Sequence, residues 1–226
     1  MSTLLLRLAA PLQAWGRDSK FDKVRQTGNE PSKSGVTGLL AAALGRDRAA
    51  PLDDLAALRF GVRVVRRGRL LCDYHTVSRH PNPRPGLNRT DYVTKRYYLS
   101  DAVFIAGFES EDRAHLAELE EALRFPAFPL FLGRRSCPPT PPLSLGITDE
   151  KLEDALMHAQ CREIAANPDD EPVRLLLDAD RVTAATPLVQ DLPISFSPRR
   201  REHGFRAVQE MVTERPEHDP FGELEG

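Results

Sequence analysis

Runs of apolar residues separated by polar stretches divide the first two thirds of the chain into short elements of two kinds. Residues 3–8 are apolar but for Thr3 and Arg7, which is typical of a buried strand. Residues 35–44, GVTGLLAAAL, predict a short apolar helix that ends at Gly45. Residues 59–65 alternate basic and apolar positions, which predicts a half-buried strand with one basic face.

The later part of this region repeats the same two kinds of element. The pattern predicts a strand, an amphipathic helix and a last strand at residues 101–109, 112–124 and 143–147. With a finger inserted after the second strand, the order is β-α-β-β-α-β. This order predicts an α+β, ferredoxin-like (RRM-like) domain over residues 1–148, a scaffold of many RNA-binding modules that does not by itself imply function.

The remaining residues, 149–226, predict a smaller C-terminal β-rich region. A short helix is expected over residues 149–160 and a linker over 165–171. Strands are expected over residues 173–177 and 181–189, with another after the basic run at 199–206. The tail from residue 216 is acidic, and we expect it to be frayed.

The inserted finger, about residues 74–98, combines basic and aromatic residues. It holds five Lys or Arg against one Asp, together with four tyrosines. Its middle, His80 to Gly86, contains three prolines and cannot be helical, whereas its two arms are β-branched and aromatic. These features predict a protruding β-hairpin thumb suited to single-stranded nucleic acid, since guanidinium groups pair with phosphates and bases stack on rings. A mobile, solvated loop is the alternative.

The charge of the chain is divided between its two parts. The formal net charge of −2 argues against a general nucleic-acid binder. Residues 1–100, however, carry 18 Lys and Arg and 8 Asp and Glu, a net of +10, whereas residues 101–226 carry the remaining 13 and 25, a net of −12. This division predicts a bipolar molecule, with one part facing a polyanion.

Two further segments could bind phosphate. Residues 130–142, LFLGRRSCPPTPP, place Gly133 before Arg134, Arg135 and Ser136, so that the backbone could approach a phosphate held by guanidinium groups. The predicted helix at residues 35–44 starts beside Lys33 and Ser34, and small residues at a helix N-terminus suit an anion. A tightly packed core helix explains the same glycines equally well.

The sequence shows few patterns that are typical of metal sites, membrane segments or catalytic sites. Three cysteines and six histidines show no metal-ligand spacing, so we expect neither metal nor cofactor. No signal peptide or membrane span is expected, and free thiols indicate the cytoplasm. One enzymatic alternative remains, a metal-independent ribonuclease using Tyr74, His75 and Lys95 or Lys33, although adjacent strand residues point to opposite faces.

Several segments together resemble a known family. They are LRLAAPLQAWG, PSKSGVTGLLAAALG, DYHTV, YYLSDAVF and LGRRSCPPTPPL, at residues 6–16, 31–45, 73–77, 97–104 and 132–143. In this order they resemble the CasD family, the type I-E form of the fifth Cas protein family within the RAMP superfamily. The resemblance implies a non-catalytic subunit of the Cascade surveillance complex, which serves antiviral defence.

The resemblance also implies partners and site residues. Family members bind the 5′ handle of CRISPR RNA, cap the backbone of CasC subunits and contact the large subunit CasA, and the complex reads target DNA by base pairing. Related type I-C proteins cut RNA, which keeps an endoribonuclease for CRISPR repeat RNA as the alternative. The implied RNA-binding residues are Gln13, Trp15, Arg25, Lys33, Ser34, Tyr74, His75, Lys95, Arg96, Arg134, Arg135 and Ser136. Of Arg134 and Arg135, we expect one to pair inside the fold and the other to bind phosphate.

Overall fold

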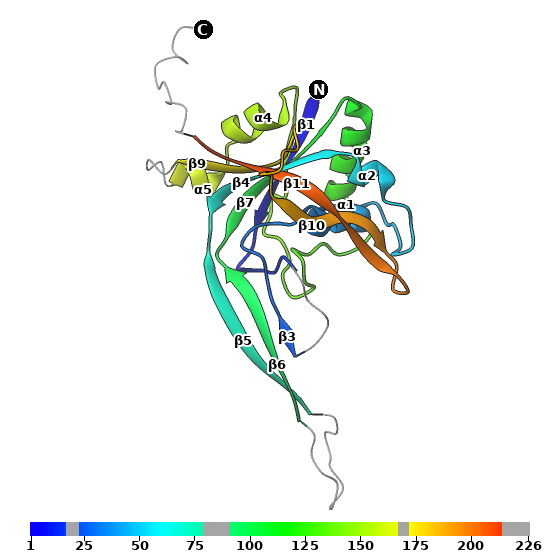
Figure 1. Cartoon of the computed structure of the whole chain (residues 1–226), viewed down its shortest axis with the longest axis vertical. Coiled ribbons are helices and arrows are strands. Elements are labelled where there is room, and N and C mark those ends of the chain that lie inside the picture. Colours follow the sequence, from blue (N-terminus) through cyan, green and yellow to red (C-terminus); the bar gives the residue numbers. More distant parts are fainter. Residues whose placement is uncertain (17–22, 79–90, 167–171, 214–226) are drawn as a thin grey trace, which may run out of the picture.

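A seven-stranded antiparallel sheet forms the body of the protein in a computed structural model that describes residues 1–16, 23–78, 91–166 and 172–213 (Figure 1). The strand order is β10-β11-β9-β4-β7-β1-β8. The bounds are β1 (Ser2–Ala9), β4 (Arg59–Arg66), β7 (Val103–Ser110), β8 (Ser144–Thr148), β9 (Val173–Asp178), β10 (Leu188–Phe196) and β11 (Arg201–Thr213).

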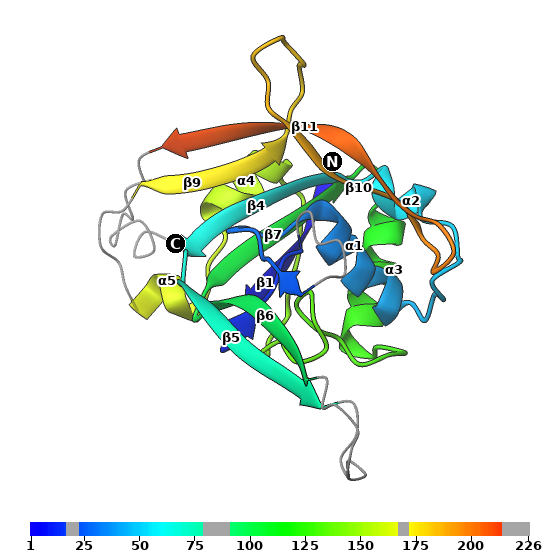
Figure 2. The same cartoon turned by 60° about the horizontal axis from the view of Figure 1, so that its bottom comes forward.

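Helices cover both faces of this sheet (Figures 1 and 2). One face packs against α1 (Lys33–Ala43), α2 (Asp53–Ala56) and α3 (Arg113–Arg124), and the other against α4 (Leu152–His158) and α5 (Arg162–Ala166). Ser32 caps α1 by accepting a hydrogen bond from the Gly35 N–H, and Asp112 caps α3 in the same way from the His115 N–H. The two longer helices lie close to where the sequence pattern predicts them.

The central strands are buried on both faces because helices lie on each side. On β1, Leu4, Leu6 and Leu8 join the apolar cluster under α1 and α3, whereas Leu5 joins the cluster under α4. This explains the nearly continuous apolar run of β1. The prediction that β4 has an exposed basic face is wrong for Arg63, which is buried and donates hydrogen bonds to carbonyls of α4 and the residue after it.

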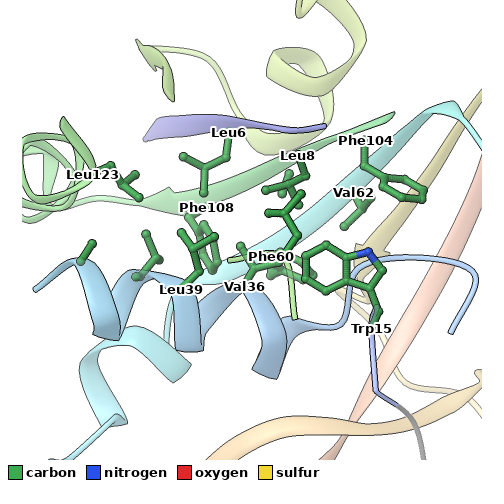
Figure 3. Close-up of a cluster of buried hydrophobic side chains, with 14 of the residues drawn as sticks. Leu6, Leu8, Trp15, Val36, Leu39, Phe60, Val62, Phe104, Phe108 and Leu123 are labelled. Carbon is green, nitrogen blue, oxygen red and sulfur yellow. The ribbon is translucent and has the colours of Figure 1, made fainter. Parts of the chain in front are cut away.

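The larger apolar cluster lies between the sheet and α1 (Figure 3). Phe60 on β4 and Phe108 on β7 pack with ring centroids 5.1 Å apart. Val36 and Leu39 of α1 face them, and Trp15 closes the end of the cluster. Burial of such side chains, each contributing about 1.5–3 kcal/mol, stabilises the attachment of α1 to the sheet.

A second, four-stranded sheet projects from the body as a long hairpin (Figure 1). Its strands are β2 (Leu12–Gln13), β3 (Val24–Arg25), β5 (Arg69–Ser78) and β6 (Asp91–Ser100). β5 and β6 pair in an unbroken antiparallel register, so the predicted hairpin strands are confirmed. The proline-containing tip, predicted around residues 80–86, lies outside the described residues.

The C-terminal strands continue the main sheet, because β9 pairs with β4 and β11 pairs with β9. The prediction of a strand over residues 181–189 is wrong for most of its length, since β10 begins only at Leu188. Before it, Thr183 and Thr186 form a turn in which the Thr186 Oγ1 accepts the Thr183 N–H at 2.8 Å. The division of the chain at residue 148 stays a prediction, and the acidic tail lies outside the described residues.

Candidate nucleic-acid interface

At the hairpin base three strands lie side by side in one sheet, with β3 along one edge of β6 and β5 along the other. The Lys95 backbone N–H donates to the Lys23 carbonyl at 2.7 Å, and Arg25 lies in register with Arg96. Paired positions on neighbouring strands share a face of the sheet. Arg25 and Arg96 therefore lie on the same face of the hairpin.

The register of β5 and β6 assigns the other predicted residues to two faces. Asp73 pairs with Arg96 and His75 with Thr94, so these residues share the face of Arg25. Tyr74 pairs with Lys95 and lies on the opposite face, because side chains alternate along a strand. We call the first the arginine face (Arg25, Asp73, His75, Arg96 and Tyr98) and the second the tyrosine face (Leu70, Cys72, Tyr74, Lys95 and Tyr97).

Arg134 connects the loop after residue 132 to the arginine face. Its guanidinium carbon lies 4.7 Å from the centroid of the Tyr98 ring, and its Nη2 donates to the carbonyls of Arg25 and Gln26 at 3.1 and 3.3 Å. A guanidinium above an aromatic ring gains a cation–π attraction. Two segments that are far apart in the sequence, the Gly133 loop and the thumb, thus meet at one place.

Two guanidinium nitrogens at this place have no acceptor among the described residues. They are the Arg96 Nε and the Arg134 Nη1, and both are buried from solvent. A buried N–H without a partner costs about 1–3 kcal/mol, more for a charged group. Both arginines carry the positive charge that a phosphate oxygen would neutralise while accepting these hydrogen bonds.

Arg134 and Arg135 have different surroundings, whereas the binding of phosphate by either of them stays a prediction. Arg135 is exposed and available to a ligand, as is Ser136 beside it. Arg134 contacts the fold, but its printed partners are two carbonyls and a ring instead of an acid.

The sequence predicts that Gly133 lets the backbone approach a phosphate, but the group that lies close to it in the structure is a backbone carbonyl. Its φ is +81°, and an added Cβ would lie 1.7 Å from the Ala14 carbonyl oxygen. The close approach that needs glycine is therefore to the protein's own backbone, not to a phosphate.

A buried arginine on β1 holds the far end of the same loop. The Arg7 side chain is 1% exposed, and its Nη1 donates to the carbonyls of Thr140 and Pro142 at 2.9 and 3.3 Å. Its Nε and Nη2 bind the carboxylate of Glu163 on α5. The hydrogen bonds from Arg7 hold the pKa of Glu163 well below its usual range, although burial opposes this shift. Sequence reasoning missed Arg7 because it lies within an apolar run.

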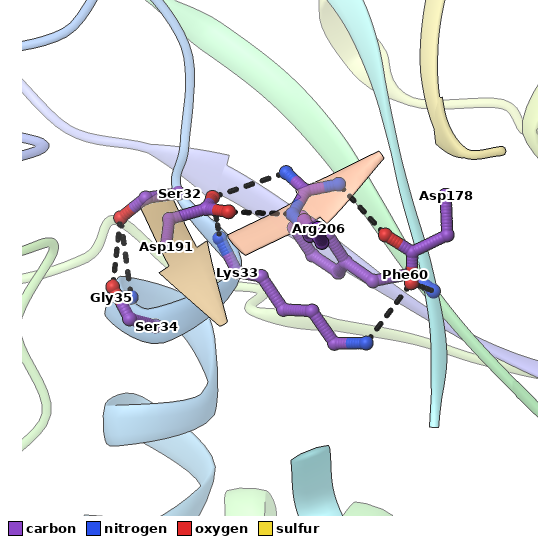
Figure 4. A network of polar contacts seen from close by, with 8 residues as sticks. All are labelled: Ser32, Lys33, Ser34, Gly35, Phe60, Asp178, Asp191 and Arg206. Carbon is purple, nitrogen blue, oxygen red and sulfur yellow. Dashed lines mark hydrogen bonds and ion pairs between the residues drawn. The ribbon is translucent and has the colours of Figure 1, made fainter. Parts of the chain in front are cut away.

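The helix start at Lys33 is not an open anion site in this structure (Figure 4). The Lys33 backbone N–H donates to Asp191 at 2.8 Å, and the Lys33 Nζ binds Asp178 at 2.9 Å. Arg206 bridges both carboxylates. This buried group, which we call the ion cluster (Lys33, Asp178, Asp191 and Arg206), supplies the anion that the helix terminus attracts. Ser34 is half-buried next to Ser32, the cap of the helix.

Gln13 and Trp15 lie in the core, which differs from their predicted place in an RNA-facing loop. Gln13 is fully buried, and its Nε2 donates to the carbonyls of Leu8 and Ala102. Its Oε1 accepts the Trp15 Nε1–H at 3.1 Å, and the Trp15 ring is 1% exposed. All of their ring and amide donors are thereby satisfied, which explains why polar groups can be buried here.

A family model described as CRISPR-associated protein (Cas_Cas5) matches residues 3–209, which is nearly the whole of the described structure. The chain belongs to this Cas5 family. Membership agrees with the resemblance found in the sequence, and the match extends over the C-terminal strands, where the sequence motifs are sparse.

One known protein and two solved structures are similar to this chain. Over 159 residues, the Cas5 chain is 41% identical to the CRISPR system Cascade subunit CasD of Escherichia coli (strain K12), covering 64% of this chain and 70% of that protein. A chain of a solved CRISPR RNA-guided surveillance complex aligns with a TM-score of 0.74 at 32% identity, covering 94% and 90% of the two chains. A solved Cas protein aligns with a TM-score of 0.72 at 43% identity, covering 96% and 100%.

The described part of this Cas5 chain offers little for other chemistry. Within it, no group of three or more His, Cys, Asp or Glu could hold a metal ion. None of its helices is long and apolar enough to cross a membrane. Tyr74 and His75, the pair suggested for RNA cleavage, lie on the tyrosine face and the arginine face, so they do not converge on one substrate bond.

Proposed function

We propose that this Cas5 protein binds the 5′ handle of CRISPR RNA as a non-catalytic subunit of a Cascade surveillance complex and caps one end of its CasC backbone. The names of its relatives support the setting, since one is a Cascade subunit and another belongs to an RNA-guided surveillance complex. The body supports the role of scaffold. Its central strand order, β8-β1-β7-β4, is the order that a ferredoxin-like β-α-β-β-α-β domain has.

The observation on which the proposal rests is the pair of unpartnered guanidinium nitrogens on the arginine face. Arg96 Nε and Arg134 Nη1 are buried N–H donors with no acceptor in the described protein, and Tyr98 stacks beneath one of the two groups. An RNA backbone brings phosphate oxygens, which are strong acceptors for arginine. Filling two empty donor positions gives the RNA a defined place on the hairpin.

Other residues extend this place in two directions. The exposed Arg135 and Ser136 lie on the same loop as Arg134, and His75 lies farther out on the arginine face. They could contact the RNA on either side of the phosphate that Arg96 and Arg134 bind. Tyr74 and Lys95 are on the tyrosine face, so they contact RNA only if the strand wraps around the hairpin. Lys33, Gln13 and Trp15 act in this proposal by supporting the fold.

The remaining parts of the proposal concern proteins. The residues after 100 have a net charge of −12 in the sequence, which favours contact with basic partner proteins. CasC and CasA are the expected neighbours, and target DNA is reached through base pairing with the guide RNA. The alternative, an endoribonuclease for repeat RNA, needs an acid and a base near one phosphate, and Tyr74 and His75 do not provide them from opposite faces.

A binding measurement with matched variants tests the proposal. We expect Arg96→Gln to weaken binding of handle RNA by about tenfold and to reduce the slope of log K against log salt by about 1. Arg124→Gln is the control, because Arg124 is an equally charged, exposed residue on α3, paired with Glu120. Equal affinities of the two variants and the wild type would remove Arg96 from the interface.

A cleavage assay separates the two functions. Purified protein is incubated with repeat RNA in EDTA, and we expect the RNA to remain intact. Cleavage by the wild type that is lost in His75→Ala would establish the ribonuclease and contradict a purely structural role.

A further inference from the structure

The outer edge of β5 differs from the other sheet edges of the protein. At one end of the main sheet, β8 has only five residues, and its register with β1 shifts between Leu5 and Leu6. At the other end, β10 has two register shifts and contains Pro193. β5 has ten residues, no proline and no register shift, and in the described structure it pairs only with β6. Short edges, bulges and prolines block pairing with other chains, and β5 lacks all three.

The hydrogen-bond pattern shows which backbone groups of β5 point to this free edge. The N–H groups of Lys95 and Asp101 donate to Lys23 and Pro11, on the β3 and β2 side of β6. In an antiparallel pair, both backbone groups of a residue point to the same side. The odd-numbered residues of β6 therefore turn away from β5, and so do the residues paired with them. The N–H and C=O groups at the free edge belong to Leu70, Cys72, Tyr74 and Thr76.

The side chains at these four positions are uncharged and all lie on the tyrosine face. Leu70 is 62% exposed and Tyr74 63%, and Cys72 and Thr76 are exposed as well. The charged residues of β5 are at odd-numbered positions, whose backbone groups are directed to β6. The edge thus presents alternating donors and acceptors beside an apolar surface.

We propose that the β5 edge binds an extended segment of a neighbouring protein subunit by β-strand addition. This rests on the proposed membership of a multi-subunit complex. A strand supplies both donors and acceptors in register, and apolar side chains on the tyrosine face give it specificity. RNA fits this edge poorly, because phosphates accept hydrogen bonds but offer none to the carbonyls. The binding of RNA is assigned to the arginine face, and the two faces serve different partners.

Charge indicates what the added segment contains. Residues 66–78 and 91–100 hold five Lys or Arg and two Asp, a net of +3, so pairing of two copies would bring like charges together. The incoming segment is therefore neutral or acidic. A hollow of about 410 Å³ lies at the root of the tyrosine face, lined by Leu70, Leu99 and Val64, and its polar side holds Arg67 together with Arg174, which is paired with Glu30 and Glu210. It can take one side chain of the incoming segment.

A proline at an even-numbered position tests the proposal, because it removes an outward N–H and leaves the bonds to β6 in place. We expect Thr76→Pro to weaken incorporation into the complex, reconstituted from co-expressed subunits and CRISPR RNA, by about tenfold, the equivalent of one net hydrogen bond. Thr76→Val keeps the N–H and the side-chain shape and should assemble as the wild type does. Equal incorporation of both variants would overturn the proposal.

Hydrogen exchange on the wild type gives an independent readout. In the isolated chain, the amides of Cys72, Tyr74 and Thr76 should exchange faster than those of Asp73 and His75, which bond to β6. In the assembled complex all five should be protected. Fast exchange of the even-numbered amides in the complex would overturn strand addition, as would protection by handle RNA alone or protection that rises with the concentration of the isolated chain.

The outcomes separate this inference from the proposed function. RNA affinity of the isolated chain reports the arginine face, and Thr76→Pro should leave it unchanged. If the wild type fails to bind handle RNA, the proposed function fails, whereas exchange at the β5 edge of the assembled complex still decides strand addition.

Discussion

Two groups of basic residues, which include the predicted RNA-binding residues Lys33 in one and Arg96 and Arg134 in the other, have opposite surroundings in the folded protein. In the ion cluster, the buried Lys33 and the half-buried Arg206 bind the carboxylates of Asp178 and Asp191. At the hairpin base, Arg134 contacts two carbonyls and the Tyr98 ring, Arg96 lies on β6, and one nitrogen of each has no acceptor in the described protein. The difference shows that a cation is available to a ligand only where the fold does not already supply an anion.

The carboxylates of the ion cluster keep Arg206 charged although it lies away from solvent. Burial alone would lower the pKa of Arg206, but hydrogen bonds and charge from Asp191 and Asp178 offset it, and the pKa is raised. The cluster joins the start of α1 to β9, β10 and β11 (Figure 4). Its cations therefore stabilise the contact between the start of α1 and the C-terminal strands of the main sheet.

The largest effect is expected from breaking the ion cluster. Asp191→Ala removes one of the two carboxylates that bind Arg206 and leaves the Lys33 N–H without its acceptor, and breaking a buried pair costs about 3–5 kcal/mol. The melting temperature should fall by several degrees, because each kcal/mol of lost stability lowers it by about 2–4 °C. The folded variant should keep the RNA affinity of the wild type, measured at a temperature where both are native. A loss of RNA affinity with unchanged stability would reverse the assignment of this cluster.

A change at Gly133 should affect both stability and binding. In Gly133→Ala the new Cβ meets the Ala14 carbonyl, and the left-handed backbone adds strain, so we expect a loss of about 2–4 kcal/mol. RNA affinity should fall as well, because the loop that positions Arg134 must move. Gly146→Ala is the control, since its φ is also positive but an added Cβ there contacts nothing within 4 Å. Similar losses in both variants would show that strain alone is responsible.

Acid should weaken the support of the same loop through Glu163. Arg7 lowers the pKa of this carboxyl below the ordinary value of 4.5, so the unfolded chain binds the proton more readily. The contribution is complete above that ordinary value and is lost as the pH falls toward the lowered pKa. Glu163→Gln should lower the free energy of unfolding by about 1.5–3 kcal/mol at neutral pH. Between about pH 5 and 3, the stability of this variant should fall less steeply than that of the wild type, as measured by urea unfolding at each pH. An unchanged slope would mean that Arg7 does not hold Glu163 in solution.

The sequence predicts the elements better than it predicts the partners of individual side chains. Apolar periodicity locates α1 and α3, and β-branched and aromatic composition locates the hairpin strands, because these patterns are local. The burial of Lys33 is not predictable from them, since Asp178 and Asp191 are 145 and 158 residues away in the chain. The same holds for Arg134, whose ring partner Tyr98 comes from another segment.

The smallest predicted effect tests whether the two faces of the hairpin differ. Tyr98→Leu keeps an apolar side chain but removes the ring beneath Arg134, which should cost about 0.5–1 kcal/mol of cation–π attraction. Arg134 then loses its fixed orientation, so we expect RNA affinity to fall a few-fold with no change in the salt slope, since no charge is removed.

Tyr97→Leu provides the matched control, because Tyr97 is the neighbouring residue and lies on the tyrosine face. It should leave RNA affinity unchanged in the isolated chain, as measured by the same salt titration. Equal losses in the two variants would mean that RNA contacts both faces, and the separation of an RNA side from a protein side of the thumb would then be wrong. A loss confined to Tyr98→Leu would place the RNA next to Arg134, since this ring reaches the ligand only through that guanidinium group.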